Sequence, residues 1–479
     1  MKQGVRMFNC AIDLGAYGGR VMLGELKDGV VTLTEMHRFP NDPVRVGGVL
    51  YWDALRLFHE IKAGLKKIAA EKVPLAGIGI DTWGVDYALL DARGHVCGAP
   101  VHYRDTRTES CHKKAAAFIP PMALYARTGI QHLPFNTLYQ LIADGEMRPE
   151  ILQTAQDLLF MPDLFTYFLT GVKINEYTSA STSQLMNAAA RDWDRELLDM
   201  IKPEGLGRLL RPLTNPGAVV GPLCADVLAE TGLDPAARFI AVGSHDTASA
   251  VAGTPLTDAS CAYLSCGTWS LLGMELDAPD LSEASCRMNL TNEGGLDGKI
   301  RYLKNINGLW MIQQLLKSYN DRAPEENRYG FADLIRAAEN AADKRFFIAP
   351  NDPSFSNPPD MAEAVREYCV KTWQGVPSGI GETAIAVYNG ITGEYAAVLK
   401  DLEEIRGQRV STLHMVGGGV QDTLLCRMTA KTTGKRVETG PVEATALGNI
   451  AAQWIGLGKV SSLAEARAVI RRSFEPSVY

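Results

Sequence analysis

Short apolar runs separated by glycine-rich or charged turns make up the beginning of the chain. The runs cover residues 8–14, 21–26 and 30–39, and the last one alternates apolar and polar positions in its first half. A period of two is the pattern of a strand with one buried face. We therefore expect three consecutive strands, joined by turns at Gly15–Gly19 and Lys27–Gly29.

A helical spacing replaces this alternation after residue 52. The apolar positions that recur every three or four residues are Leu55, Phe58, Ile61, Leu65 and Ile68. This spacing predicts an amphipathic helix, with Asp53 as a candidate N-cap at its start. The following run, LAGIGIDTW, is continuously apolar like a central strand, and residues 85–90 predict one more short strand.

The second half of the chain repeats this arrangement. Strands are expected at residues 262–265, 269–276, 412–416 and 436–439, and helices at residues 380–405, 423–432 and 443–455. A strand meander followed by alternating helices and strands starts a ribonuclease H-like unit, because parallel strands need helical crossovers. The predicted fold class is α/β, with two ribonuclease H-like domains of the actin and hexokinase type around a central cleft. We place the domains at residues 1–250 and 251–479.

Composition and charge narrow the class of protein. The 479 residues are 46% hydrophobic and 22% charged, which is ordinary globular usage. A net charge of −7 argues against a nucleic-acid partner. No run reaches the roughly 18 apolar residues that span a bilayer, so no membrane partner is expected either.

The N-terminal sequence and the cysteines indicate a cytoplasmic protein. Asp13 interrupts the first apolar run, so we expect no signal peptide. The nine cysteines are scattered without a CxxC pair or a metal-ligand spacing. We expect reduced thiols that fill buried space. A monomer and a homodimer are both compatible with the sequence.

The segment DLGAYGGR places an acid and several glycines where the first strand ends. Gly15, Gly18 and Gly19 would let backbone N–H groups approach phosphate oxygens closely. Asp13 could hold Mg²⁺ directly or through water, because hard cations prefer oxygen ligands. The alternative is a plain hairpin turn with a solvated aspartate.

The segment SHDTASA offers a carboxylate after the apolar strand FIAVG. Asp246, flanked by His245 and Thr247, is a candidate general base. A kinase needs such a group to accept the proton of the attacking hydroxyl. The alternative is that Asp246 caps a helix beginning at Thr247, and one residue could do both.

Four other segments carry candidate binding residues. Thr268, in CGTWS, could bond a phosphate oxygen, and the glycines of VGGGVQDTLL could admit a phosphate or a flat ring beside a helix N-terminus. Packing turns are the alternative for both. IDTWGVDY and KNINGLWMIQ mix aromatic and polar residues, which suits sugars, or else forms the edge of a core.

Together these segments have the layout of the ribonuclease H-like ATPases. Over roughly residues 8–455, the amino-acid sequence resembles the FGGY family of carbohydrate kinases. The segments that carry the resemblance include IGIDTWGVDYALLD, LPFNTLYQL, EYTSASTSQLMN, SHDTASAV, AYLSCGTWSLLG, LKNINGLWMIQ and VGGGVQDTLL. Within the family they look most similar to the kinases of L-rhamnulose.

The resemblance implies transfer of the γ-phosphoryl group of ATP, with Mg²⁺, to the 1-hydroxyl of L-rhamnulose. It implies a sugar-binding N-terminal domain and a nucleotide-binding C-terminal domain. It makes Asp246 the proton acceptor and Asp13 the carboxylate nearest Mg²⁺. The residues it places at the sugar are Gly84, His245, Asp246, Thr247 and Asn305. The residues it places at ATP are Ala16, Tyr17, Gly18, Gly19, Arg20, Thr268, Gln313, Gly417, Gly418 and Gly419.

The sequence departs from the family pattern at two places. Tyr17 and Gly18 stand where the family usually has two hydroxyl residues, and Asp422 replaces the usual asparagine. Hydroxyl bonds to phosphate would be lost, and an acceptor-only carboxylate cannot donate as an amide does.

Three alternative functions remain: a kinase for another ketose such as L-fuculose or xylulose, a non-catalytic sugar- and nucleotide-binding relative, and an actin-like filament protein.

Overall fold

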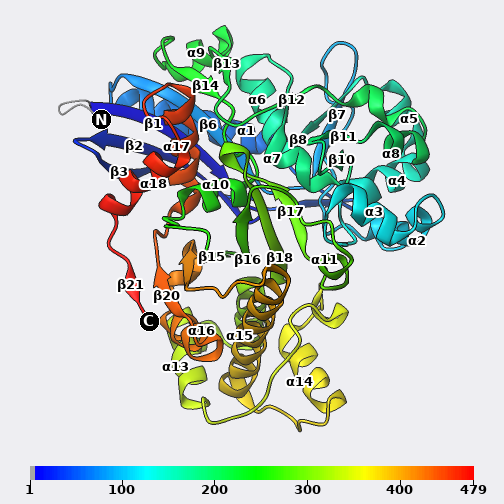
Figure 1. Cartoon of the computed structure of the whole chain (residues 1–479), viewed down its shortest axis with the longest axis vertical. Coiled ribbons are helices and arrows are strands. Elements are labelled where there is room, and N and C mark those ends of the chain that lie inside the picture. The colour runs from blue at the N-terminus through cyan, green and yellow to red at the C-terminus, as the bar shows by residue number, and fades with distance from the viewer. Residues whose placement is uncertain (1–5) are drawn as a thin grey trace. The chain divides into compact units, whose positions relative to one another are not determined.

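The computed structural model describes residues 6–479 (Figure 1), which form two compact units. Unit 1 contains residues 6–255, 275–302 and 444–475. Unit 2 contains Leu256–Met274, Leu303–Glu443 and Pro476–Tyr479. Because stretches from late in the chain belong to unit 1, a single cut near residue 250 does not describe these units.

Unit 1 is built on a six-stranded sheet. Its strand order is β13-β14-β6-β1-β2-β3. The strands are β1 (Arg6–Leu14), β2 (Gly18–Lys27), β3 (Val30–Pro40), β6 (Leu75–Thr82), β13 (Val219–Gly221) and β14 (Arg238–Ile240). β1, β2 and β3 form an antiparallel meander, whereas β6 lies parallel to β1 and to β14. The expected meander of three strands is therefore confirmed.

Helices cover both faces of this sheet. The helices of unit 1 that matter for the site are α1 (Ala54–Ala70), α7 (Tyr177–Ala180), α9 (Ala225–Thr231), α10 (Asp246–Gly253), α17 (Ala444–Gly456) and α18 (Leu463–Ser473). One core packs α1 against β1 and β2 through residues such as Ile12, Val21 and Ile61. A second core packs the opposite sides of these strands, through Ala11 and Met22, against α17 and α18. The result is a three-layer α/β unit.

The packing of α10 on α17 explains why the late helix belongs to unit 1. A Cβ atom on Gly253 would lie 2.0 Å from the carbonyl oxygen of Ala444, and one on Gly448 would lie 1.7 Å from that of Ser249. Only glycine permits such a close approach of two helix backbones. The close packing fixes α10, and with it Asp246 at its first turn, relative to the sheet.

Unit 2 also combines a hairpin, parallel strands and helices. Its strands are β15 (Cys261–Cys266), β16 (Trp269–Leu276), β19 (Thr412–Val416), β20 (Arg436–Thr439) and β21 (Ser477–Val478). β15 pairs antiparallel with β16 and parallel with β19, which is parallel to β20. Its helices are α12 (Leu309–Asn320), α13 (Phe331–Asn340), α14 (Met361–Lys371), α15 (Gly379–Arg406) and α16 (Thr423–Thr433). The expected hairpin, long helix and strand–helix–strand succession are confirmed.

Some local predictions need correction. Asp53 does cap α1, since its side chain accepts a hydrogen bond from the N–H of Arg56 at 3.1 Å. Leu55 is 72% exposed, however, and Leu57 takes the buried position instead. The short strand β7 begins at Tyr87 rather than at residue 85, because Val85 adopts a left-handed backbone (φ 65°) that no strand accommodates.

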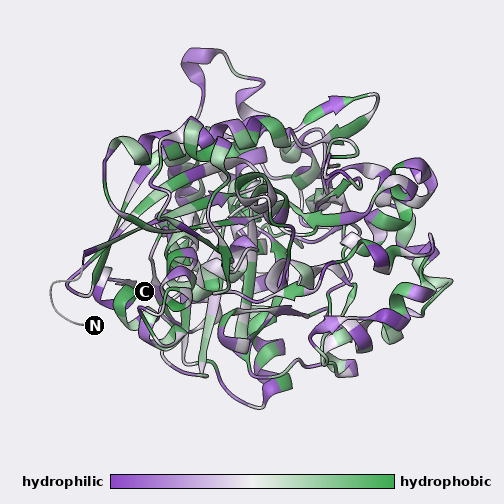
Figure 2. Ribbon diagram, turned by 90° about the horizontal axis from the view of Figure 1, so that it is seen from above, coloured by the Kyte–Doolittle hydropathy of each residue, from purple (hydrophilic) through white to green (hydrophobic). Residues whose placement is uncertain are grey.

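The cysteines are reduced, but not all of them are buried. Each of the nine is a free thiol, and Cys97, Cys224 and Cys286 are only half-buried. The remaining six fill core positions, as expected. Hydrophilic and hydrophobic residues are interspersed along the helices, so the helices are amphipathic (Figure 2). Within residues 6–479, no helix is both long and apolar enough to cross a membrane.

Candidate active site

The turn between β1 and β2 is braced from within unit 1. The N–H of Gly15 donates to the carbonyl oxygen of Gly18 at 2.9 Å, and the Asn41 side-chain amide donates to the carbonyl oxygen of Gly15 at 2.9 Å. A Cβ on Gly19 would lie 2.3 Å from the Phe39 ring. Tyr17 is 44% exposed, so its bulk is directed away from the packed side of the turn. No pattern in the sequence had indicated the hydrogen bond from Asn41.

Two aspartates lie next to each other at the ends of β1 and β6. Asp13 and Asp81 are paired in the parallel register of these strands. Asp13 Oδ2 accepts a hydrogen bond from Arg20 at 2.6 Å, and Asp81 Oδ2 accepts one from Asn449 on α17 at 2.6 Å. Burial raises the pKa of Asp81 well above its usual range, and the nearby charge of Asp13 raises it further. Asp81 Oδ1 is buried and has no hydrogen-bond partner among the described residues.

Asp246 is the first residue of α10, close to the same edge of the sheet. The N-cap position belongs to His245, and no side chain caps this helix, so the cap role considered for Asp246 is wrong. Its Oδ1 instead accepts a hydrogen bond from the Thr247 hydroxyl at 3.1 Å. The helix N-terminus favours a negative charge at this position. The side chain is 30% exposed, so a substrate hydroxyl can reach it.

Gly84 lies directly against the imidazole of His245. A Cβ on Gly84 would lie 2.6 Å from His245 Nε2 and 2.7 Å from Cδ2. The two segments are joined by a backbone hydrogen bond of 2.9 Å from the N–H of Thr82 to the carbonyl oxygen of Ser244. Because residue 84 has no side chain, the imidazole of His245 can pack directly against its backbone.

Glu176 holds the loop that carries His245 and Asp246. Its Oε2 accepts hydrogen bonds from the Ser244 hydroxyl at 2.6 Å and the Ser244 N–H at 3.3 Å. The same oxygen accepts from the N–H and the hydroxyl of Thr178 at 2.8 and 2.6 Å. Burial raises the pKa of Glu176, while these donors favour its ionised form. Nothing in the segment EYTSAS had indicated this role.

The nucleotide residues expected in the second half come together around the β15–β16 turn of unit 2. The backbone N–H of Trp310, in the first turn of α12, donates to the carbonyl oxygen of Thr268 at 3.2 Å. α12 also carries Gln313. Gly417 and Gly419 pack on Cys266, with Cβ positions 2.9 Å from its carbonyl oxygen and 2.5 Å from its Cβ. Gly418 meets nothing within 4 Å and stays open.

The unexpected aspartate of the late turn has a structural use. Asp422 is the N-cap of α16, and its Oδ1 accepts a hydrogen bond from the N–H of Leu425 at 3.0 Å. Its Oδ2 accepts from the Tyr388 hydroxyl at 2.5 Å. Both bonds need an acceptor only, so the carboxylate that replaces the usual asparagine is well suited to this place.

The comparison with family models decides the identity of the fold. The N-terminal domain model of the FGGY family of carbohydrate kinases matches residues 8–253, and the C-terminal domain model matches residues 262–457. The chain belongs to the FGGY family of carbohydrate kinases. It is therefore a sugar kinase, and ATP is its co-substrate. The predicted two-domain α/β class is confirmed.

Curated FGGY relatives match over nearly the whole chain. A rhamnulokinase from Bacteroides thetaiotaomicron is 40% identical over 98% of this chain and 95% of the relative. A rhamnulokinase from Enterobacter sp. (strain 638) is 42% identical over 97% of this chain and 92% of the relative.

Solved structures of other kinases share the fold. The xylulose kinase from Lactobacillus acidophilus superposes with a TM-score of 0.79 at 17% identity, covering 99% of this chain and 93% of the other. The glycerol kinase from Plasmodium falciparum gives a TM-score of 0.75 at 16% identity, covering 99% and 94%. At such identities the likeness supports the fold alone.

The FGGY site residues predicted from the sequence are distributed over both units. Unit 1 holds Asp13, Ala16–Arg20, Gly84 and the segment His245–Thr247. Unit 2 holds Thr268, Asn305, Gln313 and Gly417–Gly419. Asn305 is on β18 (Ile300–Asn307), a strand that begins in unit 1 and ends in unit 2. Their contacts with sugar and nucleotide stay predictions.

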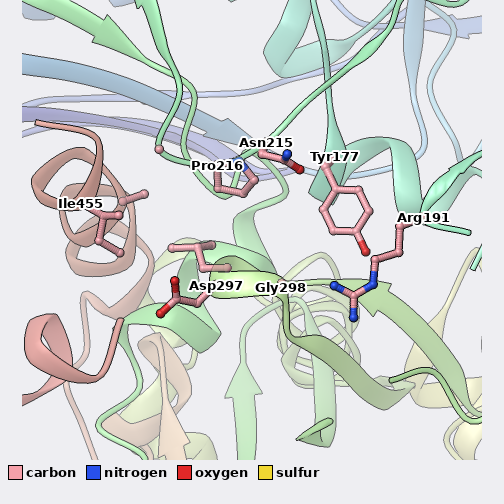
Figure 3. A pocket seen from close by; sticks show the side chains of 11 residues that line it. Tyr177, Arg191, Asn215, Pro216, Asp297, Gly298 and Ile455 are labelled. Carbon is pink, nitrogen blue, oxygen red and sulfur yellow. The ribbon is translucent and has the colours of Figure 1, made fainter. Parts of the chain in front are cut away.

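A pocket of about 500 Å³ in unit 1 contains none of these residues (Figure 3). It is lined by Tyr177, Arg191, Asn215, Pro216, Gly217, Gly295, Leu296, Asp297, Gly298, Ala452 and Ile455. The side chains of Tyr177 and Arg191 point toward each other at one end of it. Asp246, the candidate general base, does not line this pocket.

Proposed function

We propose that this FGGY kinase phosphorylates L-rhamnulose at its 1-hydroxyl, with ATP as the donor, and releases L-rhamnulose 1-phosphate and ADP in rhamnose catabolism. The observation that carries the proposal is the carboxylate of Asp246, which lies at a helix N-terminus beside His245, whose imidazole packs on Gly84. The rhamnulokinases that are 40% and 42% identical support the choice of sugar.

Asp246 acts as the general base in this proposal. As the sugar 1-oxygen forms its bond to the γ-phosphorus, the bond from that phosphorus to the β,γ-bridging oxygen breaks, and ADP leaves. The hydroxyl proton passes to Asp246. His245 and Thr247 hold the sugar next to this carboxylate, and the absence of a side chain at Gly84 leaves room for the imidazole of His245.

The glycine-rich turns of the two units are assigned to ATP. The β1–β2 turn offers backbone N–H groups from Ala16 to Gly19, and Arg20 adds a positive charge. In unit 2, open Gly418 and the Thr268 hydroxyl face the nucleotide in this assignment. The lost hydroxyls at positions 17 and 18 leave the backbone as the main phosphate ligand of the first turn.

Mg²⁺ fits the carboxylates at the ends of β1 and β6. Asp81 Oδ1 is a buried oxygen without a hydrogen-bond partner among the described residues, and Asp13 lies beside it. Within residues 6–479 no three His, Cys, Asp or Glu side chains form a metal-ligating group. Phosphate oxygens and water would therefore complete the shell, as is usual for Mg²⁺. The bound ion would offset negative charge on the phosphates.

The pH dependence of the sugar reaction is expected to follow Asp246. Burial raises the pKa of this carboxyl to about 7, the charge of Asp13 raises it, and the Thr247 hydroxyl and Arg301 lower it. Only the deprotonated form accepts a proton, so kcat/KM for the ketose should fall about tenfold per pH unit below this pKa and level off above it. A direct ADP assay at saturating MgATP measures the profile. A flat profile through neutral pH would contradict the assignment.

A panel of ketoses tests the proposed substrate. L-rhamnulose, L-fuculose and D-xylulose are compared with MgATP, and ADP formation is measured directly. We expect kcat/KM to be highest for L-rhamnulose by at least about 10-fold, the discrimination that a few polar contacts supply. A higher value for another ketose would replace the substrate but keep the kinase. ATP binding without ADP release on any sugar would favour a non-catalytic relative.

The remaining expectations concern the partners, the location and the oligomeric state of the enzyme. Its partners are a small-molecule ketose and ATP, as the family requires. The cytoplasmic location and a monomeric or homodimeric state stay predictions, which fractionation of cells and sedimentation of the pure enzyme would check.

A further inference from the structure

A fully buried arginine lies behind His245 in unit 1. Arg301, on the first residues of β18, is 0% exposed. Its Nη1 lies 3.2 Å from His245 Nδ1 and 2.9 Å from Glu293 Oε2, and its Nε donates to the carbonyl oxygen of Gly294 at 2.7 Å. A guanidinium that is buried away from solvent is stable only beside a counter-charge. Glu293 on β17 (Thr291–Gly294) supplies this charge.

The contact with Arg301 determines which ring nitrogen of His245 carries the proton. A guanidinium only donates hydrogen bonds, so His245 Nδ1 must be the acceptor and carry no hydrogen. Glu293 Oε2 lies 3.9 Å from Nδ1, too far to accept a hydrogen bond from it. Burial and the positive charge of Arg301 lower the pKa of His245 well below its usual value, so the ring is neutral. The single proton is then on Nε2.

The protonated nitrogen lies near Asp246, the proposed general base. Nε2 is the ring atom next to the missing side chain of Gly84. It lies 3.8 Å from Asp246 Oδ1, too far for a direct hydrogen bond. Among the described residues, none accepts a hydrogen bond from this N–H. A hydroxyl oxygen between the two groups could accept from Nε2 and donate its own proton to Asp246.

We propose that Arg301 is a positioning residue that holds His245 as the Nε2–H tautomer, so that His245 donates a hydrogen bond to a sugar oxygen beside Asp246. The part that concerns the sugar rests on the proposed function. With the other tautomer, Nε2 would be a second acceptor and would compete with Asp246 for the same hydroxyl proton. The donor instead stabilises negative charge on the oxygen as the proton leaves.

Burying Arg301 costs folding stability, and this cost supports a role for Arg301 in the site. Its Nη2 is buried and finds no acceptor among the described residues. Buried donors without partners are rare in folded proteins because they cost stability. An apolar pair of similar volume in place of Arg301 and Glu293 would pack without this cost. The hydrogen bond that the guanidinium donates to His245 accounts for its presence.

The tautomer can be read directly from the full-length enzyme. Histidine labelled with ¹⁵N gives different nitrogen shifts for protonated and bare ring positions, and the His245→Asn variant assigns the signal. We expect His245 to show a protonated Nε2 and a bare Nδ1 in the absence of sugar. The reverse pattern in the wild-type protein would overturn the proposal. Because no sugar is present, this result does not depend on the proposed function.

Three variants connect the tautomer to the reaction. Arg301→Met combined with Glu293→Gln removes the buried pair together, and we expect the Nδ1–H form to appear and kcat/KM for L-rhamnulose to fall on the order of tenfold or more, with the KM for ATP unchanged. Arg301→Lys keeps a donor and should keep the Nε2–H form. Glu293→Gln alone should keep it as well, since Arg301 remains.

Each outcome of these variants decides one point. An unchanged tautomer with full ketose turnover in the double variant would refute the role of Arg301. If the double variant does not fold, as circular dichroism would show, the wild-type and Arg301→Lys spectra decide. An Nε2–H signal in an enzyme that phosphorylates no ketose would support the tautomer and contradict only the proposed function.

Discussion

Asp246→Asn is expected to reduce sugar-dependent ADP release by about 10²- to 10⁴-fold, the range that a general base contributes. The amide has nearly the same shape and still accepts the hydrogen bond from the Thr247 hydroxyl, so α10 and its surroundings should fold normally. It cannot take up the proton of the attacking hydroxyl. Steady-state kinetics with L-rhamnulose and MgATP measure the loss, and the melting temperature reports the fold.

A matched control is available in the same unit. Asp226 lies in the first turn of α9 and is exposed, so Asp226→Asn makes the same chemical change at another helix N-terminus. This variant should keep wild-type turnover. Retained turnover in Asp246→Asn as well would remove Asp246 from the proposed mechanism, whereas loss in both variants would indicate a general effect on folding.

Many candidate site residues could be named from the sequence because they lie in short continuous segments. The end of β1, the segment after β14 and the β15–β16 turn each combine a strand with a glycine or an acid in a few residues. Apolar runs and glycines predict such local structure directly. The strands and α1 were therefore located to within a few residues, although the buried face of α1 includes Leu57 and not Leu55.

The residues that support the site could not be predicted in the same way. Glu176 binds Ser244 across 68 residues of sequence, Arg301 reaches His245 across 56, and Asn449 reaches Asp81 across 368. A glutamate or an arginine in a sequence is most often solvated, and no periodicity marks one that is fully buried. Their roles depend on contacts that exist only after the chain has folded.

The same limit applies to α17. Its pattern of Ala446, Leu447, Ile450 and Trp454 states that the helix is buried, but not against which sheet. The sheet against which α17 packs is determined by Gly253 and Gly448, because these glycines let α10 and α17 approach closely. A late helix thereby joins the unit of the N-terminal sheet, and Asn449 reaches Asp81 from it.

Gly84→Ala is expected to lower kcat/KM for the ketose by about 100-fold, because displacements of about 1 Å at a reacting centre have effects of this size. The new methyl would lie 2.6 Å from His245 Nε2, and this ring cannot simply turn away, since Arg301 holds its other side. The KM for ATP should not change. Gly393→Ala is the control, because nothing lies within 4 Å of its added carbon and alanine favours the helix.

A double-mutant cycle identifies the route of this effect. If the methyl acts by displacing the imidazole, it should have little further effect once His245→Ala has removed the ring, so the two losses would be far from additive. Additive losses would mean that residue 84 contacts the sugar on its own account. The cycle therefore separates a direct contact of Gly84 with the substrate from its role in leaving space for a correctly oriented histidine.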